Sequence, residues 1–164
     1  LKGKPSVLGV ASGMVAGLAT ITPASGFVTI PAALLIGFAA GVVCYLAVTK
    51  LKSHFGYDDS LDVFGVHAAG SITGMLLVGL LASPLVNPAI ATTFQVNGTV
   101  VSLAGSGAQL GRQALAVLFT AALAGIVSFI LLRLVDAVVG LRVDPDEENA
   151  GLDITQHGER AYTD

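Results

Sequence analysis

A stretch of 45 residues without a charged side chain, from residue 5 to residue 49, constrains this chain more than any other feature. A buried helix of a soluble protein is rarely half that long, whereas about 20 apolar residues cross the ~30 Å hydrocarbon layer of a bilayer. Residues 63–83 are uncharged as well, and so is the segment that follows them, to residue 111. Only 12% of the residues are charged, against about 25% in an ordinary soluble domain. The sequence therefore predicts an all-α, polytopic transmembrane helix bundle.

Four apolar segments are long enough to span a bilayer. We expect them at about residues 5–22, 27–49, 60–83 and 109–140. Proline and glycine within residues 23–26 predict a tight turn between the first two spans, and residues 50–58 are expected to form a polar loop. The chain then divides into a transmembrane region, residues 1–140, and a tail, residues 141–164. The tail is acidic, which indicates that it lies in water.

Basic side chains gather before the first span, after the second and around the end of the fourth, at Lys2, Lys4, Lys50, Lys52, Arg133 and Arg142. Loops on the cytoplasmic side of a membrane carry an excess of lysine and arginine. The long loop of residues 84–111 carries no charge of either sign. We therefore expect both ends of the chain to be cytoplasmic and this loop to lie outside.

Two local patterns predict further structure. The pair Asn97-Gly98, between β-prone residues, predicts a β-hairpin in the outer loop. Glycine also recurs at every fourth position in three spans, at Gly9, Gly13 and Gly17, at Gly37 and Gly41, and at Gly70 and Gly74. Small residues at this spacing let helices approach closely in a membrane. The spacing predicts tight helix packing, and a narrow path between helices is the alternative interpretation.

His67 is the one ionisable residue within the uncharged stretch of the third span. On an α-helix it shares a broad face with Val63, Phe64, Gly70, Ser71 and Gly74, so we expect the imidazole to face other helices. A rise of about 1.5 Å per residue places it roughly a third of the way across. Ionisable residues at such depth often mark a substrate or proton path. The alternative is a neutral structural histidine bonded to a backbone carbonyl.

Three aspartates, Asp58, Asp59 and Asp62, precede the third span, and we interpret them as caps of its first turn. The sequence has no His-Glu-x-x-His zinc motif and no phosphate-binding glycine loop. Its single cysteine, Cys44, lies within a span and is interpreted as a packing residue. These patterns predict no metal, no cofactor, no nucleic-acid partner and no enzymatic activity.

Residues 56–67, GYDDSLDVFGVH, resemble a signature of the ammonium transporter (Amt/MEP/Rh) family, on the Amt side. Further segments are similar to that family in the same order, at residues 4–9, 17–24, 140–143, 151–153 and 157–162. The resemblance implies a C-terminal piece of a longer transporter, containing the last four of eleven spans. It also implies a homotrimer with one narrow, mostly apolar pore in each subunit. We expect these four spans alone not to enclose that pore.

The resemblance implies roles for individual residues. His67 matches the second of two histidines that line the middle of the pore. Val15 and Val63 match apolar positions along the pore, and Thr22 is expected near it. The implied substrate is ammonium or ammonia, and the implied location is the plasma or inner membrane. In many bacteria a trimeric PII-type signal protein binds the cytoplasmic face. An ammonium sensor, or a membrane module that only assembles, remains the alternative.

Overall fold

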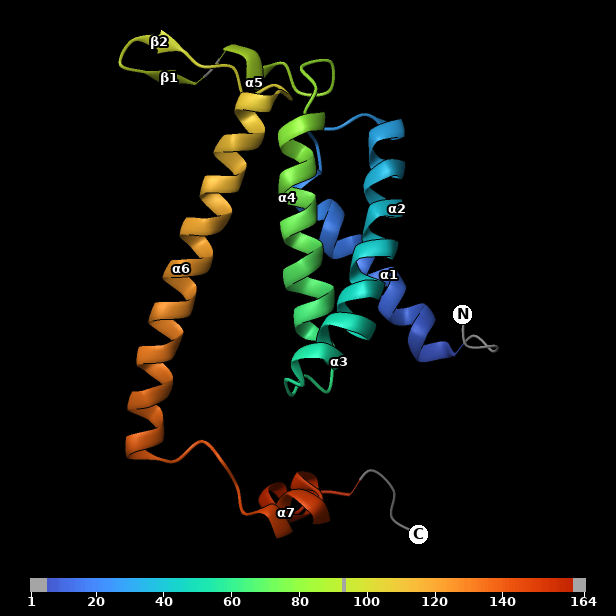
Figure 1. Ribbon diagram of the computed structural model, residues 1–164, viewed down its shortest axis with the longest axis vertical. Coiled ribbons are helices and arrows are strands. Elements are labelled where there is room, and N and C mark those ends of the chain that lie inside the picture. The colour runs from blue at the N-terminus through green and yellow to red at the C-terminus, as the bar shows by residue number, and fades with distance from the viewer. Residues whose placement is uncertain (1–5, 93, 161–164) are drawn as a thin grey trace. The chain divides into compact units, whose positions relative to one another are not determined.

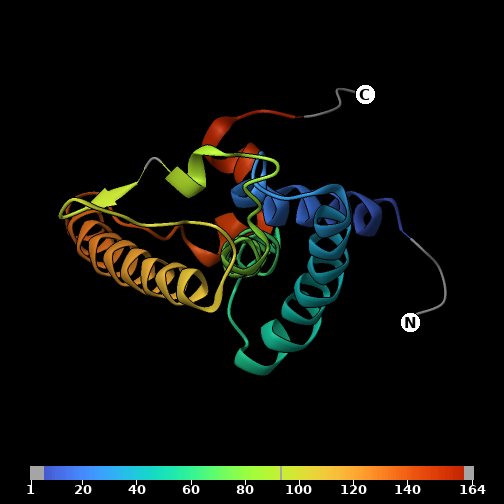
Figure 2. The same cartoon turned by 90° about the horizontal axis from the view of Figure 1, so that it is seen from above.

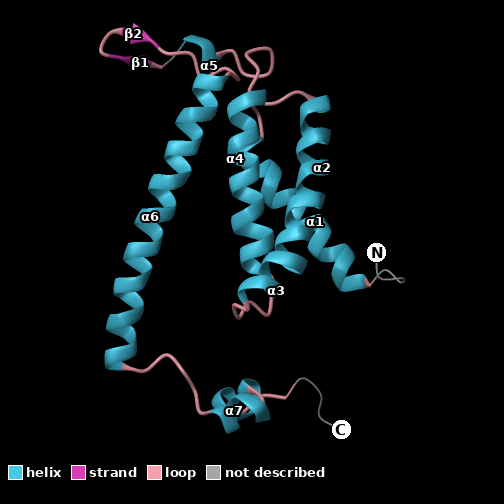
Figure 3. Ribbon diagram, in the orientation of Figure 1, coloured by secondary structure: helices cyan, strands magenta, loops and turns pink. Residues whose placement is uncertain are grey.

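The computed structural model describes residues 6–92 and 94–160, and within them one two-stranded hairpin interrupts an otherwise helical chain (Figure 3). Four helices are long and apolar enough to cross a membrane: Val7–Ala24, Ile30–Phe55, Phe64–Leu81 and Gly107–Val138. The predicted all-α architecture with four spans is confirmed. The basic leader with Lys2 and Lys4, and the end of the tail, lie outside the described residues. The chain has two compact parts, Leu1–Phe119 and Thr120–Asp164, which are described separately.

The first part begins with helix α1, Val7–Ile21 (Figure 1). Ser6 caps this helix, because its hydroxyl accepts a hydrogen bond of 3.0 Å from the backbone N–H three residues later. The chain then tightens into the 3-10 turn η1, Thr22–Ala24, in which Pro23 occupies the first turn. Gly26 follows in a left-handed conformation, with φ of 79°. The predicted tight turn between the first two spans is thus confirmed.

The second span is one continuous helix made of three segments: α2 (Ile30–Leu46), the π-helical η2 (Ala47–Leu51) and α3 (Lys52–Phe55). The predicted polar loop at residues 50–58 is therefore wrong for its first half. Lys50 and Lys52 have long unbranched side chains, which favour a helix, and Lys50 is exposed near its end. The helix ends only at Gly56, which is left-handed with φ of 62°.

The third span begins later than predicted. Residues 60–62 form a turn, and the helix consists of the π-helical segment η3, Phe64–Ala68, followed by α4, Ala69–Leu81. In η3 the N–H of Ala69 bonds to the carbonyl oxygen of Phe64, five residues earlier. An α-helix closes this bond four residues back. Single π-helical turns of this kind are rare and occur frequently at functional sites.

Gly70 and Gly74 bring α4 into contact with α1. A Cβ added at Gly74 would meet the backbone carbonyl oxygen of Thr20, and one added at Gly70 would lie 2.8 Å from the Thr20 hydroxyl. Thr20 is fully buried, and its hydroxyl donates a 2.8 Å hydrogen bond to the carbonyl oxygen of Ala16. Figures 1 and 2 show α1 inclined across α4 at this contact. The predicted close approach is confirmed for these two glycines.

The other repeated glycines do not pack in this way. Within the described residues, an added Cβ would have no neighbour within 4 Å at Gly13, Gly17, Gly37 or Gly41. Gly65, which lies outside the fourfold pattern, does pack tightly, because its added Cβ would lie 2.6 Å from Val48 Cγ2. The fourfold spacing predicted three packed glycine faces, of which only the face with Gly70 and Gly74 makes a close contact. The spacing also missed Gly65, which packs closely within the π turn.

Buried apolar side chains form two small clusters between α1, α2 and the third span. Ala16, Cys44 and Val66 form the one next to the π turn η3. Ala24, Ile36 and Val78 form the other, toward the turn that joins the first two spans. The first cluster consists of smaller side chains, as expected for membrane helices that approach closely, whereas the second contains the larger Ile36.

The loop after α4 contains a short helix, α5 (Ala89–Thr92), and then strands β1 (Gln95–Val96) and β2 (Thr99–Val100). The strands pair antiparallel, and the two residues between them, Asn97 and Gly98, have φ of 50° and 77°. Two positive φ values suit the tight hairpin turn that Asn-Gly favours. The predicted hairpin is confirmed.

Helix α6, Gly107–Val138, follows this loop and ends close to the predicted limit of the fourth span. Its residues up to Phe119 belong to the first part of the chain and the rest to the second, which also holds α7, Pro145–Ala150, and the π-helical turn η4, Asp153–His157. Asp144 caps α7, since its carboxylate accepts a 2.9 Å hydrogen bond from the N–H of Asp146. The side-chain amide of Gln156 donates 2.7 Å to the carboxylate of Glu147, which joins η4 to α7. The acidic tail thus contains helical structure of its own.

Candidate functional site around His67

His67 lies in the π turn η3, and its side chain is exposed. The buried row of the third span repeats every four residues, at Val66, Gly70, Gly74 and Val78. His67 is one residue, or about 100°, around the helix from this row. The expectation that the imidazole shares the glycine face was too broad. The glycines pack on Thr20, whereas His67 and Ser71 lie on a neighbouring face that α1 and α2 leave uncovered.

The other predicted pathway residues are also exposed. Val63 lies one turn before His67 on the same span and is 51% exposed, and Val15 in α1 is 41% exposed. Thr22 is exposed in η1, where its hydroxyl donates a 2.6 Å hydrogen bond to the carbonyl oxygen of Leu18. Thr20 contacts Gly74, which lies about two helical turns after His67 on the third span. Thr22, two residues after Thr20, is therefore also about two turns away from His67. The structure places Val63 next to His67 and separates Thr22 from both.

The aspartates before the third span differ in what they bind. Both carboxylate oxygens of Asp59 accept backbone hydrogen bonds of 2.8 Å, one from the N–H of Val63 and one from that of Phe64. These are among the first N–H groups of the helix, which have no partner within it. Among the hydrogen bonds of residues 6–92 and 94–160, none involves the carboxylate of Asp58, which is exposed.

Asp62 takes part in an ion pair with Lys52 rather than in a bond to a free N–H group. Lys52 Nζ lies 2.7 Å from Asp62 Oδ1, and it also donates a 2.6 Å hydrogen bond to the carbonyl oxygen of Asp59. Asp62 has a left-handed backbone, with φ of 56°, which aspartate tolerates better than most residues do. The lysine thus joins the start of α3 to Asp59 and Asp62 in the loop before η3.

Sequence reasoning missed this ion pair, although opposite charges ten residues apart on either side of a short polar loop are a usable signal. It also missed an aromatic contact in the same loop. The rings of Tyr57 and Phe64 meet edge to face, with centroids 5.5 Å apart. The phenol oxygen of Tyr57 is buried and has no hydrogen-bond partner within the described residues. The loop between α3 and η3 is therefore attached to the π turn through the ring of Tyr57, and to α3 through the ion pair.

The π turn itself rests on the second span. Cys44 Sγ donates a long hydrogen bond, 3.8 Å, to the carbonyl oxygen of Val66. Gly65 meets Val48 on the same side. Cys44 is buried, as its interpretation as a packing residue requires, but it also supplies a donor to a carbonyl of the π turn. Within residues 6–92 and 94–160, no group of three or more histidine, cysteine or acidic residues is arranged to hold a metal ion.

A cavity of about 390 Å³ lies between α1, α2 and η3. Its wall includes Gly9, Gly13 and Gly41 as well as Cys44 and Asp62. His67 is not among its lining residues, so this cavity and the exposed face with His67 are different features. Glycines of the repeated patterns in α1 and α2 thus line this cavity.

Removing the Asp59 carboxylate is expected to destabilise the start of the third span. Asp59→Ala leaves two backbone N–H groups without their acceptor, which should cost about 1–2 kcal/mol of unfolding free energy. The measurement is thermal unfolding of the purified full-length protein, in which a lower Tm is expected. Asp58→Ala is the matched control and should leave Tm unchanged. An equal shift for both variants would show that the two bonds to Asp59 contribute nothing specific.

Comparison with known proteins places the chain among membrane transporters. A family model described as the Ammonium Transporter Family matches residues 1–162. The chain is 46% identical over 164 residues to the ammonium transporter Amt1 of Archaeoglobus fulgidus, which covers 99% of this chain and 39% of that protein. It is 42% identical over 161 residues to an ammonium transporter of Bacillus subtilis, covering 98% of this chain and 38% of the relative. These relatives are transporters and not enzymes.

Solved structures agree with the sequence matches. The crystal structure of Saccharomyces cerevisiae Mep2 matches with a TM-score of 0.72 and 34% identity, over 87% of this chain and 31% of Mep2. The structure of Candida albicans Mep2 matches with a TM-score of 0.73 and 28% identity, over 88% and 31% of the two chains. The chain therefore spans less than two-fifths of the length of the proteins it matches.

Proposed function

Because this chain belongs to the Ammonium Transporter Family, we propose that the longer protein moves ammonium or ammonia across a membrane by a path on which His67 lies. The observation that carries the proposal is the match of the family model to residues 1–162. It is supported by the position of His67, an exposed ionisable residue inside an otherwise uncharged span. A histidine so placed needs a partner from outside these four spans, or the transported species itself.

The chemistry of the substrate suits an imidazole in an apolar path. Ammonium and potassium have similar size and equal charge, so a purely ionic site would distinguish them poorly. Ammonium can donate hydrogen bonds and can lose a proton, and a neutral imidazole can accept either. An apolar wall disfavours any bare cation, because desolvating a charge is costly. Val15 and Val63 are proposed as parts of this wall, and Thr22 as a polar group near the path.

The remaining proposals concern assembly and location. We place the protein in the plasma or inner membrane as a homotrimer, with the tail on the cytoplasmic side. The lysines at the end of the second span support this orientation, since basic loops stay on the cytoplasmic side. A PII-type signal protein is proposed to bind the same side. Cross-linking of the intact protein in its membrane tests the trimer directly.

The test of transport uses the complete gene in cells that lack their own ammonium uptake. We expect it to restore growth on limiting ammonium and to produce saturable uptake of labelled methylammonium that excess potassium does not inhibit. A vector carrying no insert is the control, and membrane levels of the protein are measured in parallel. Normal membrane levels without uptake would contradict transport and would favour the alternative, an ammonium sensor or a module that only assembles.

A further inference from the structure

We propose that Lys52 and Asp62 act as positioning residues, which hold the π turn η3 so that the His67 imidazole stays on the transport path. This inference rests on the proposed function, because it assigns the ion pair a role only if His67 meets the substrate. It adds two residues on the loop side of the span, neither of which is itself placed on the path.

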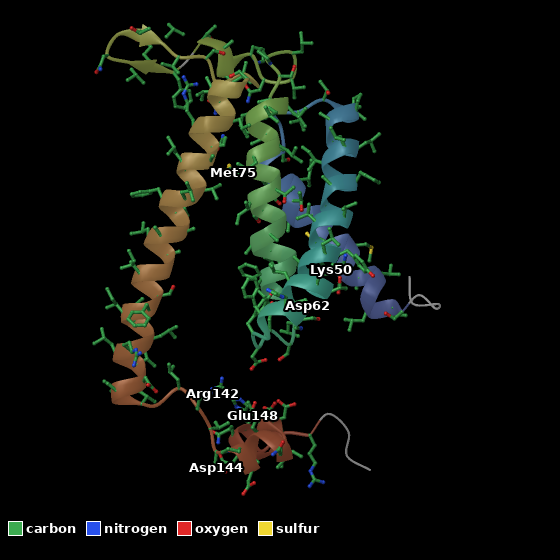
Figure 4. All side chains as sticks on the ribbon, in the orientation of Figure 1. Lys50, Asp62, Met75, Arg142, Asp144 and Glu148 are labelled. Carbon is green, nitrogen blue, oxygen red and sulfur yellow. The ribbon has the colours of Figure 1, made fainter. Side chains whose placement is uncertain are left out.

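The first step of the argument is connectivity. Lys52 Nζ binds both Asp62 Oδ1 and the carbonyl oxygen of Asp59, at 2.7 and 2.6 Å. Asp59 in turn holds the first two N–H groups of the third span through its carboxylate. One ammonium group therefore fixes the backbone on which the helix starts. Figure 4 shows Asp62 at the end of the span nearest α3.

The second step is distance along the chain. The carbonyl oxygen of Asp62 accepts a 2.9 Å hydrogen bond from the N–H of Val66, the residue before His67. Asp62 is thus bonded through its side chain to Lys52 and through its backbone to Val66, the residue next to His67. A change in the backbone of Asp62 is transmitted to His67 by one hydrogen bond.

The third step is the nature of the π turn. A π turn is less favourable than an α-helix, so it persists only where surrounding contacts fix it. Contacts with the second span hold one side, through Gly65 against Val48 and Cys44 against the carbonyl oxygen of Val66. The Lys52–Asp62 pair holds the start. If the turn relaxed into an α-helix, the residues before it would shift by one position, or about 100° of rotation, relative to those after it.

The fourth step concerns energy. The side chains of Lys52 and Asp62 are 30% and 29% exposed, and partly exposed ion pairs of this kind contribute little to stability. Their removal should therefore leave the protein folded. The pair fixes Asp62, whose backbone is left-handed, and the carbonyl group of Asp59. It therefore acts mainly on the local backbone geometry and adds little to the stability of the whole protein. Its loss should be seen in the selectivity of transport and much less in the amount of folded protein.

The experiment compares variants of the full-length protein for uptake of labelled methylammonium with and without excess potassium. Asp62→Asn keeps a residue that tolerates positive φ and removes the charge, and Lys52→Met removes the cation. We expect each to lower methylammonium uptake, or its resistance to potassium, by roughly two- to fivefold, because the pair cannot bias the π turn by more than it contributes. Lys52→Arg should retain parental behaviour. Lys50→Met, two residues away and exposed, is the matched control and should change nothing.

A double-mutant comparison separates positioning from simple loss of structure. Adding Lys52→Met to His67→Ala should have no further effect on selectivity if the lysine acts through the histidine, whereas independent effects would add. Full additivity, or a loss of uptake that matches the loss of folded protein, would overturn this proposal. Parental selectivity in Lys52→Met together with altered selectivity in His67→Ala would overturn it and leave the proposed function intact. If His67→Ala itself changed nothing, the path through His67 and the positioning role would both fall.

Discussion

Replacing His67 by alanine in the full-length protein is expected to reduce methylammonium uptake about 10- to 100-fold, or to allow potassium to compete for the path. A hydrogen bond to a charged partner contributes about 1.5–3 kcal/mol where water is excluded, and each 1.4 kcal/mol changes a rate tenfold. The side chain is exposed and bonded to no other described side chain. Its loss should therefore affect transport more than folding.

The measurement is labelled methylammonium uptake against increasing potassium, normalised to the amount of protein in the membrane. His54→Ala is the matched control, because His54 is also exposed but lies at the end of α3, beside Phe55. We expect that variant to behave as the parent does. Unchanged uptake together with unchanged exclusion of potassium in His67→Ala would remove His67 from the path.

Replacing Gly74 by valine is expected to prevent α4 from packing on α1. Even the Cβ would meet the carbonyl oxygen of Thr20, which is backbone and cannot rotate away. Overpacking usually costs about 1–3 kcal/mol, and a clash with backbone belongs at or above the upper end. We expect a strong decrease in the Tm of the purified full-length protein and in its yield from membranes. Gly74→Ala should have a smaller effect in the same direction.

Gly37→Ala provides the control for this series. Gly37 lies within α2, and a Cβ added there has no neighbour within 4 Å among the described residues. Alanine favours a helix over glycine by about 1 kcal/mol, so this variant should be as stable as the parent or more stable. If Gly74→Val melted at the same temperature as the parent, the close contact between α4 and Thr20 would be wrong.

Sequence patterns predicted the features that depend on local chemistry. Uncharged stretches located all four spans, Pro23 and Gly26 located the turn between the first two, and Asn97-Gly98 located the hairpin. Each of these signals acts within a few residues, either through the cost of placing charge in a bilayer or through φ values that few residues adopt. Helix limits were less accurate at the polar loop, where Lys50 and Lys52 continue the helix to Phe55.

The features that sequence reasoning missed depend on contacts between distant segments. The π turn at residues 64–68 requires Val48 and Cys44 from another helix, and no local pattern marks it. The ion pair between Lys52 and Asp62 depends on how the loop folds back. The face occupied by His67 also follows from packing, because the row that contacts α1 starts at Val66 and not at Val63. Whether His67, Val15, Val63 and Thr22 line a path stays a prediction.

The extra residue in the π turn makes the third span sensitive to length. Between Val63 and Gly74 the helix is one residue longer than an unbroken α-helix joining the same two contacts would be. Deleting one residue there would let the segment close as an unbroken α-helix with Gly74 still facing Thr20, whereas inserting one would turn Gly74 about 100° away. In a comparison of related sequences, an insertion in this interval should therefore be rarer than the loss of one residue, and longer insertions or deletions should collect in the loop of residues 84–106.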